Sequence, residues 1–157
     1  MTEPTESFAE AGFLAAPRDP SLVALYRYWE AKRGANDVPS RADIDPAELK
    51  PLLPHIILYD ALGPGSYRIR LVGEAIVAFV GRNLTGHDAT TSMTPGAAAN
   101  MRMILDAVCE TRSPRFRAGK AYWLKEKAYR DYEACFLPLA PPGQPVNMIL
   151  GGLSFAA

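Results

Sequence analysis

Residues 56–73 read IILYDALGPGSYRIRLVG. The first part of this run is largely apolar, the turn Gly63-Pro64-Gly65 follows, and apolar and polar side chains then alternate over 67–71. Alternation with a period of two is typical of a half-buried strand, and a short glycine–proline turn joins neighbouring strands. The stretch therefore predicts an antiparallel hairpin with strands over 56–62 and 67–73.

Two helices are expected after this hairpin. A short apolar segment over 74–80 is followed by Gly81, which would end the helix. Thr94-Pro95 supplies a capping residue and a proline suited to the first helical turn, so a longer helix is expected over 95–112. Its apolar side chains share one face, which indicates packing on a sheet: Ala97, Met101, Ile104, Leu105 and Val108.

Three further strands are expected after the longer helix. They cover residues 115–123, 128–139 and 146–155, and the turn between the last two is Pro141-Pro142-Gly143-Gln144-Pro145. The whole chain therefore contains five predicted strands.

The chain before the hairpin contains one clear amphipathic helix. Residues 1–19 carry four acids and one base and are expected to form a mobile arm. Pro20-Ser21 then opens a helix over 21–33, which Gly34 would end. Its apolar stripe consists of Leu22, Leu25, Tyr26 and Trp29.

A second, shorter helix is expected at Asp45-Pro46. Asp45 can cap it, and Glu48 can complete a capping box. Pro51 and Pro54 are expected to interrupt it soon afterwards, because proline disrupts a helix interior.

Length and charge indicate one domain that could meet an electrostatic partner only through a local group of charges. The 157 residues suit a single domain over 20–157 that includes the helix over 21–33. Basic and acidic residues number 17 each, so no global charge attracts nucleic acid or an anionic membrane. The acidic start lacks the pattern of a secretory signal, and no apolar run reaches the ~18 residues of a membrane span. We therefore expect a cytoplasmic protein.

Five motifs resemble a family of small bacterial proteins that consist of a single PAS domain. The similarity covers residues 20–155 and rests on Tyr28-Trp29, Pro39-Ser40-Arg41-Ala42-Asp43-Ile44-Asp45-Pro46, Leu53-Pro54, Tyr67-Arg68-Ile69-Arg70-Leu71-Val72-Gly73 and Gly81-Arg82-Asn83-Leu84-Thr85-Gly86. The resemblance implies an α+β fold with a PAS-like five-stranded antiparallel sheet and helices on one face, to which the N-terminal amphipathic helix is extra. It implies a signal-sensing or protein-interaction module with no enzymatic activity, and the signal stays unknown.

The output of such a module must pass through another molecule. The sequence carries no kinase, cyclase or DNA-binding segment, so a signalling partner protein or a change in self-association would carry the signal. We expect a homodimer, and we leave the partner protein unnamed.

An apolar cavity that binds a small apolar or aromatic ligand is expected between the longer helix over 95–112 and the inner face of the sheet. The phases of helix and strands nominate its lining as Met101, Leu105, Val108, Phe116, Tyr132, Phe136, Met148 and Leu150. The plainer interpretation is that these side chains are ordinary core, since small domains need nearly all such residues to close their interior. Tyr132 is of special interest, because a buried tyrosine needs a hydrogen-bond partner and a small-molecule ligand could supply one.

Two familiar cofactors of such domains are disfavoured by the sequence, and the cofactor is left unknown. Haem usually takes its proximal histidine from the longer helix, and residues 95–112 contain none. Flavin photoreceptors use an asparagine-cysteine-arginine run, whereas Gly81-Arg82-Asn83-Leu84 offers no cysteine.

No metal site or catalytic residue is predicted. His55 and His87 belong to no close set of three ligands, and Asp43 and Asp45 lack the glycine and glutamate of a calcium loop. A cysteine nucleophile with a histidine base is the catalytic alternative. Cys109 and Cys135 are better explained as small buried hydrophobic residues.

The segment from 112 to 130 holds most of the local positive charge. A nucleic-acid patch is one interpretation, and a solvated face with cross-strand ion pairs from Arg115 and Arg117 to Asp131 and Glu133 is the favoured one. The bases are Arg112, Arg115, Arg117, Lys120, Lys125, Lys127 and Arg130.

A small cone-shaped α+β enzyme of isomerase or hydratase type is the alternative function. It would need a buried acid and a tyrosine that face one apolar substrate. Asp131 and Glu133 share the strand phase opposite Tyr132, which argues against that arrangement.

Both faces of the central strands should be covered. The segments 56–59 and 146–155 are apolar in both phases, whereas Arg68, Arg70, Arg115 and Arg117 are expected to point outward from the flanking strands. The outer apolar band needs a cover, in its own subunit or in a partner's. The candidate cover or interface is the stripe Leu22, Leu25, Tyr26 and Trp29, with Trp29 as its anchor.

Overall fold

The computed structural model describes residues 12–121 and 130–155. Its centre is an antiparallel sheet in the order β1-β4-β5-β6-β2-β3. The five predicted strands are confirmed, and a two-residue strand adds a sixth at one edge. Residues 122–129, into which two predicted strands extend, lie outside the described residues. The strands are β1 Phe13–Leu14, β2 Ile56–Gly63, β3 Ser66–Val72, β4 Arg115–Lys120, β5 Asp131–Leu139 and β6 Met148–Phe155.

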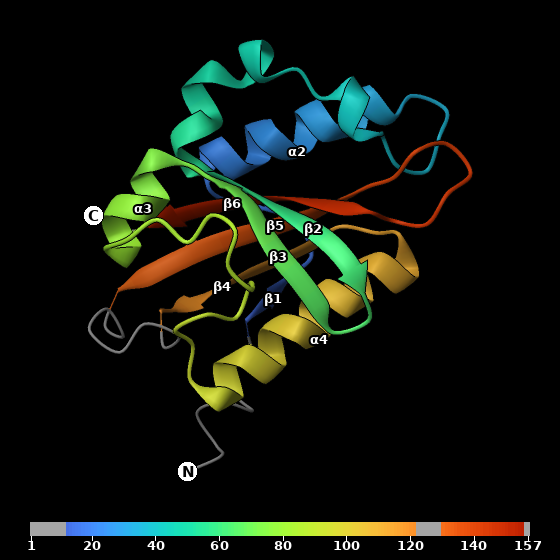
Figure 1. The fold of residues 1–157 in the computed structure, drawn as a ribbon. Helices are drawn as coiled ribbons and strands as arrows, with labels where there is room; N and C mark the ends of the chain where they lie inside the picture. Colours follow the sequence, from blue (N-terminus) through green and yellow to red (C-terminus); the bar gives the residue numbers. More distant parts are fainter. Residues whose placement is uncertain (1–11, 122–129, 156–157) are drawn as a thin grey trace.

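Helices lie on both sides of this sheet (Figure 1). The helix α2 packs on β5 and β6 from one side, and α4 packs on β5 and β3 from the other. Three of the four predicted helices, those over 21–33, 74–80 and 95–112, are confirmed to within about one residue at each end. Among the described residues, no helix combines the length and the apolar character that crossing a bilayer requires. The helices are α2 Pro20–Arg33, α3 Glu74–Val80 and α4 Pro95–Thr111, with the 3₁₀ segments η1 Arg41–Asp43 and η2 Pro46–His55.

We call the side of the sheet that packs on α2 the α2 face. Leu22, Leu25 and Trp29 are buried there, and the Trp29 indole N–H donates to the Pro138 carbonyl at 2.8 Å. A Cβ on Gly152 would lie 2.7 Å from Leu22 Cδ2, so a glycine is needed where α2 approaches β6. The predicted cover of the apolar band is therefore supplied within the same chain.

The segment just before α2 lies along the sheet. Residues 1–11 lie outside the described part of the chain, but β1 pairs with β4 through Phe13 and Leu14. The backbone N–H groups of Arg18 and Asp19 donate to the Glu133 carboxylate at 2.7 and 3.0 Å. Residues 12–19, part of the segment expected to be an arm, therefore lie along the sheet in the structure.

The segment after Asp45 also differs from its prediction. Asp45 caps it as expected, but η2 continues through Pro51 and Pro54. Its turns are 3₁₀ turns, which often serve as connectors, whereas proline disrupts the i→i−4 hydrogen bonds of an α-helix interior. Glu48 takes no part in a capping box, because its carboxylate binds the Tyr28 hydroxyl at 2.7 Å and Lys32 Nζ at 3.0 Å.

Candidate functional site

We call the side of the sheet opposite α2 the cavity face, because a cavity of about 90 Å³ lies against it. Strands form its floor, α3 and the first turns of α4 form two walls, and the loop between those helices forms a third. The apolar lining residues are Ile57, Tyr59, Ile69, Val72, Ile76, Val80, Leu84, Ala89, Met93, Ala97, Met101, Tyr132, Ala134, Phe136 and Leu153. The polar ones are Arg82, Thr91, Ser92, Asn100 and Arg117.

Strand alternation places the floor residues. Ile57 and Phe136 both pair with Gly151, on either side of β6. A Cβ on Gly151 would lie 2.7 Å from Ile57 Cγ2 and 3.2 Å from Tyr59 Cε2. Because Gly151 has no side chain, the neighbouring side chains have space to pack at the floor of the cavity.

Three of the eight predicted lining residues lie where the sequence expects them. Met101, Tyr132 and Phe136 line the cavity. Leu105 and Val108 are fully buried further along α4 and belong to the packed core instead.

The other three predicted lining residues lie on the α2 face. Phe116 meets the Tyr26 ring edge to face, with the ring centroids 4.9 Å apart. Met148 and Leu150 share the strand phase of Gly152, which contacts α2. The prediction that these three residues line the cavity is therefore corrected. Both faces of β4 and β6 are covered, so the apolar character of a residue does not show which face it lies on.

Arg117 is the cavity residue that strand alternation predicts on the opposite face. It was expected to point outward, but it lines the cavity and is only 4% exposed. In the sheet it lies between Phe13 of β1 and Ala134 of β5, and its guanidinium carbon is 5.8 Å from the centre of the Phe13 ring. Burial lowers the pKa of this guanidinium from its usual value.

Other polar groups complete the cavity lining. The Arg82 guanidinium donates to the Ser92 hydroxyl at 3.1 Å, on the exposed side of the loop. Burial raises the pKa of the Tyr59 phenol above its usual value, so this hydroxyl stays protonated at neutral pH. No group of three or more potential metal ligands occurs in the described part of the chain.

The basic segment 112–130 does not form one patch in the described part of the chain. Arg117 is buried in the cavity, while Lys120 pairs with Asp131 across the strands at 2.7 Å. Glu133, one expected cross-strand partner of the arginines, binds the backbone of residues 18 and 19 instead. Lys125 and Lys127 lie outside the described residues.

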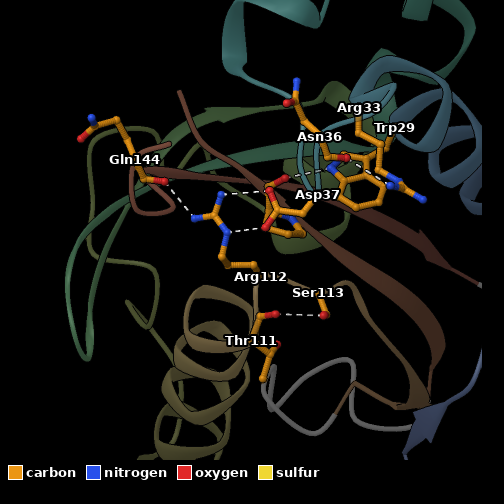
Figure 2. Close-up of polar contacts among 9 residues, drawn as sticks. Trp29, Arg33, Asn36, Asp37, Thr111, Arg112, Ser113 and Gln144 are labelled. Carbon is orange, nitrogen blue, oxygen red and sulfur yellow. Dashed lines mark hydrogen bonds and ion pairs between the residues drawn. The ribbon is translucent and has the colours of Figure 1, made fainter. Parts of the chain in front are cut away.

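Arg112 joins three segments that are distant in sequence, as Figure 2 shows. Its Nε and Nη2 donate to the two Asp37 carboxylate oxygens at 2.6 and 3.2 Å, and its Nη1 donates to the Gln144 carbonyl at 2.8 Å. The hydrogen bond from Arg112 lowers the pKa of Asp37. We call this set the Arg112 clasp. It ties the end of α4 to the chain after α2 and to the turn between β5 and β6.

A second polar contact holds the middle of α4. The Tyr67 hydroxyl donates to Asp106 Oδ1 at 2.5 Å, and the Gly65 backbone N–H donates to the same oxygen at 2.7 Å. Burial, followed by the hydrogen bond to Asp106, raises the pKa of Tyr67. Neither side chain lines the cavity, so this contact anchors α4 on the hairpin turn and does not form part of the site.

The histidines and cysteines take structural positions. His55 Nδ1 lies 3.1 Å from the Leu153 carbonyl, and the His87 backbone carbonyl accepts from Ile69. Burial raises the pKa of the Cys109 thiol, and it raises that of Cys135 to about 12. Both cysteines therefore stay as thiols at neutral pH, which is unfavourable for a nucleophile.

Comparison with known proteins identifies one family and a shared fold. The family model for the PAS domain matches residues 18–154. The PAS domain of BvgS from Bordetella pertussis is 19% identical, and the alignment covers 71% of this chain and 86% of that one with a TM-score of 0.53. No curated protein matches the sequence.

Two light-oxygen-voltage domain structures are also similar. One, from a study of a flavin analogue, is 13% identical, covering 71% of this chain and 83% of that one at a TM-score of 0.47. The other, the light state of the blue-light photoreceptor Aureochrome1, is 12% identical, covering 70% and 87% at a TM-score of 0.45.

Proposed function

We propose, since the chain belongs to the PAS domain family, that it is a sensory module whose signal is a small molecule bound on the cavity face. The observation that carries this proposal is the cavity itself. It has a volume of about 90 Å³, and its walls are mostly apolar side chains from strands, helices and one loop. Binding sites for small molecules combine such walls with a few polar groups that orient the ligand.

The size of the cavity limits the ligand. An engineered apolar cavity of roughly 150 Å³ holds benzene, and a single water needs about 10–15 Å³. A cavity of about 90 Å³ therefore suits a compact molecule of few non-hydrogen atoms. Larger cofactors would require α3, α4 or the loop between them to move outward.

The module is proposed to bind and not to catalyse. An isomerase or hydratase of the alternative type needs a carboxylate and a tyrosine that face the same substrate. Tyr132 lines the cavity, whereas Glu133 faces the opposite side of the sheet and binds the backbone near α2. The partly buried acid–tyrosine pair, Asp106 and Tyr67, lies outside the cavity lining.

A route for the signal runs along α4. This helix contributes Ala97, Asn100 and Met101 to the cavity, and the Arg112 clasp ties its far end to the chain after α2. A ligand that shifts α4 would therefore alter the surface around Asp37 and Gln144. A partner protein or a second copy of the chain would read this change, on a surface other than the stripe of α2, which is buried in cis.

A thermal-shift screen with two matched variants tests the proposal. A ligand at about 100 times its dissociation constant stabilises the folded protein by about 2.7 kcal/mol. Ala97→Phe fills the cavity from α4, whereas Ala99→Phe adds the same ring on the exposed side of that helix. We expect a ligand that raises the melting temperature of the wild type and of Ala99→Phe but not of Ala97→Phe. An equal shift in Ala97→Phe, or no shift by any compound, would contradict the proposal.

A further inference from the structure

The cavity places a positive charge against apolar walls. Arg117 lines it and is almost fully buried, and the neighbouring floor residues Ala134, Phe136 and Leu153 are apolar. Arginine is rarely buried to this extent, because removing a charge from water is costly. A buried cation in a cavity therefore needs a specific reason.

The guanidinium is held in a fixed position. Arg117 extends from the middle of β4 between two paired strands, and the Phe13 ring packs over it. A guanidinium has five N–H donors in a rigid plane, so it can bind a ligand in addition to a protein neighbour. Two of its parallel N–H groups match the two oxygens of one carboxylate.

The charges around the cavity favour an anion. Both charged residues of its described lining, Arg82 and Arg117, are basic, and no aspartate or glutamate occurs in that lining. Between apolar walls, opposite charges attract each other more strongly than they do in water. A negatively charged ligand would therefore be attracted by the basic residues of the lining, and a positively charged one would be repelled. A neutral ligand could accept hydrogen bonds from Arg117 but would gain no charge pairing.

We propose that the sensed molecule is a small monocarboxylate with a short apolar body, whose carboxylate binds Arg117 and whose body contacts the apolar floor. This inference rests on the proposed function and adds the chemical class of the ligand. The volume of about 90 Å³ fits a short or branched chain of a few carbons better than an aromatic acid. Arg82 lies toward the exposed loop, so Arg117 is the basic residue that faces the ligand. The cavity can therefore bind one carboxylate group.

The probes are propionate, isobutyrate and isovalerate, each compared with its own amide by isothermal titration calorimetry. The amides have nearly the same shape but carry no charge. We expect at least one carboxylate to bind the wild type about tenfold or more tightly than its amide, as a desolvated charge pair requires. This comparison needs no variant and therefore does not depend on how a substitution folds.

Two variants assign the effect to Arg117. Arg117→Gln keeps hydrogen-bond donors but removes the charge, and it should weaken carboxylate binding about tenfold or more while leaving the amide unchanged. Arg115→Gln removes an arginine from the same strand, outside the cavity lining, and should bind like the wild type. Circular dichroism of each variant checks that it is folded.

The outcomes separate this inference from the proposed function. Equal binding of acids and amides, or binding of neutral compounds alone, would overturn the carboxylate assignment and leave the sensory cavity standing. Unchanged carboxylate binding in folded Arg117→Gln would also overturn it. Failure of every acid, amide and compound in the thermal-shift screen would overturn both.

Discussion

Trp29 is the residue that holds α2 to the sheet. It is 3% exposed, its ring lies near Tyr26, and its indole N–H is bound to the Pro138 carbonyl. We expect Trp29→Ala to lower the free energy of unfolding by about 3–5 kcal/mol, since truncating a buried tryptophan leaves a large cavity. Urea denaturation measures this loss.

Trp29→Phe is the matched control for this prediction. It keeps an aromatic ring but removes the N–H, so a smaller loss of about 1–3 kcal/mol is expected from the unpaired carbonyl. The oligomeric state in solution should not change in either variant, because the contact lies within one chain. A Trp29→Ala protein as stable as the wild type would show that α2 contributes little to the fold.

Arg117 shows why the candidate site could be predicted only in part. The run Arg115-Phe116-Arg117-Ala118 alternates cleanly, and charged residues usually face water, so the sequence favours Phe116 as the inner residue. The helix α2 covers the other face of β4 and gives Phe116 an apolar environment there. Only the position of α2 in space, which the sequence leaves open, shows that Arg117 is the buried one.

At the scale of elements, the Arg112 clasp gives a prediction on pH. The bonded Arg112 lowers the folded-state pKa of Asp37 below its unfolded value, which is about 3.9 for aspartate. A lowered pKa stabilises the fold above the unfolded pKa, and this contribution is lost as the pH falls through the folded value. Asp37→Asn should therefore melt at a lower temperature than the wild type at pH 7, and the difference should shrink below pH ~4.

Melting curves between pH 7 and pH ~3 test this window. Glu110→Gln is the control, because it removes an exposed carboxylate from the last turns of α4 outside the clasp. It should show no such pH-dependent difference. A difference between Asp37→Asn and the wild type that stays constant over this range would mean that the carboxylate charge does not stabilise the clasp.

The elements themselves were predictable where one face is clearly polar. The alternation of Tyr67 to Leu71 and the stop at Gly81 give the hairpin and α3 close to their observed bounds. In β6 both phases are apolar, so Met148 and Leu150 could not be assigned to a face. The strand β1 has two residues and thus no period to detect, and η2 contradicts the usual effect of proline.

At the scale of the whole molecule, α2 is part of the domain and not an appendage. It buries Leu22, Leu25 and Trp29 on strands β5 and β6, whose other face borders the cavity. Deleting residues 1–33 would expose this apolar face, and such faces lead to association. We expect the truncated protein to melt at a lower temperature or to aggregate.

Light scattering and thermal melting of two truncations test this expectation. Deletion of residues 1–11 is the control, because it leaves β1 and α2 in place. It should retain the melting temperature and the oligomeric state of the full chain. If deletion of 1–33 also left both unchanged, α2 would not be needed to cover the sheet.

Native mass spectrometry of freshly purified wild type and Ala97→Phe tests the sensory cavity most directly. We predict that the wild type carries a small molecule that is released on denaturation, and that Ala97→Phe, with its cavity filled, has the mass of the bare chain. The same bound mass on both proteins would contradict this account, as would a bare wild type that stays bare after incubation with the screened ligands.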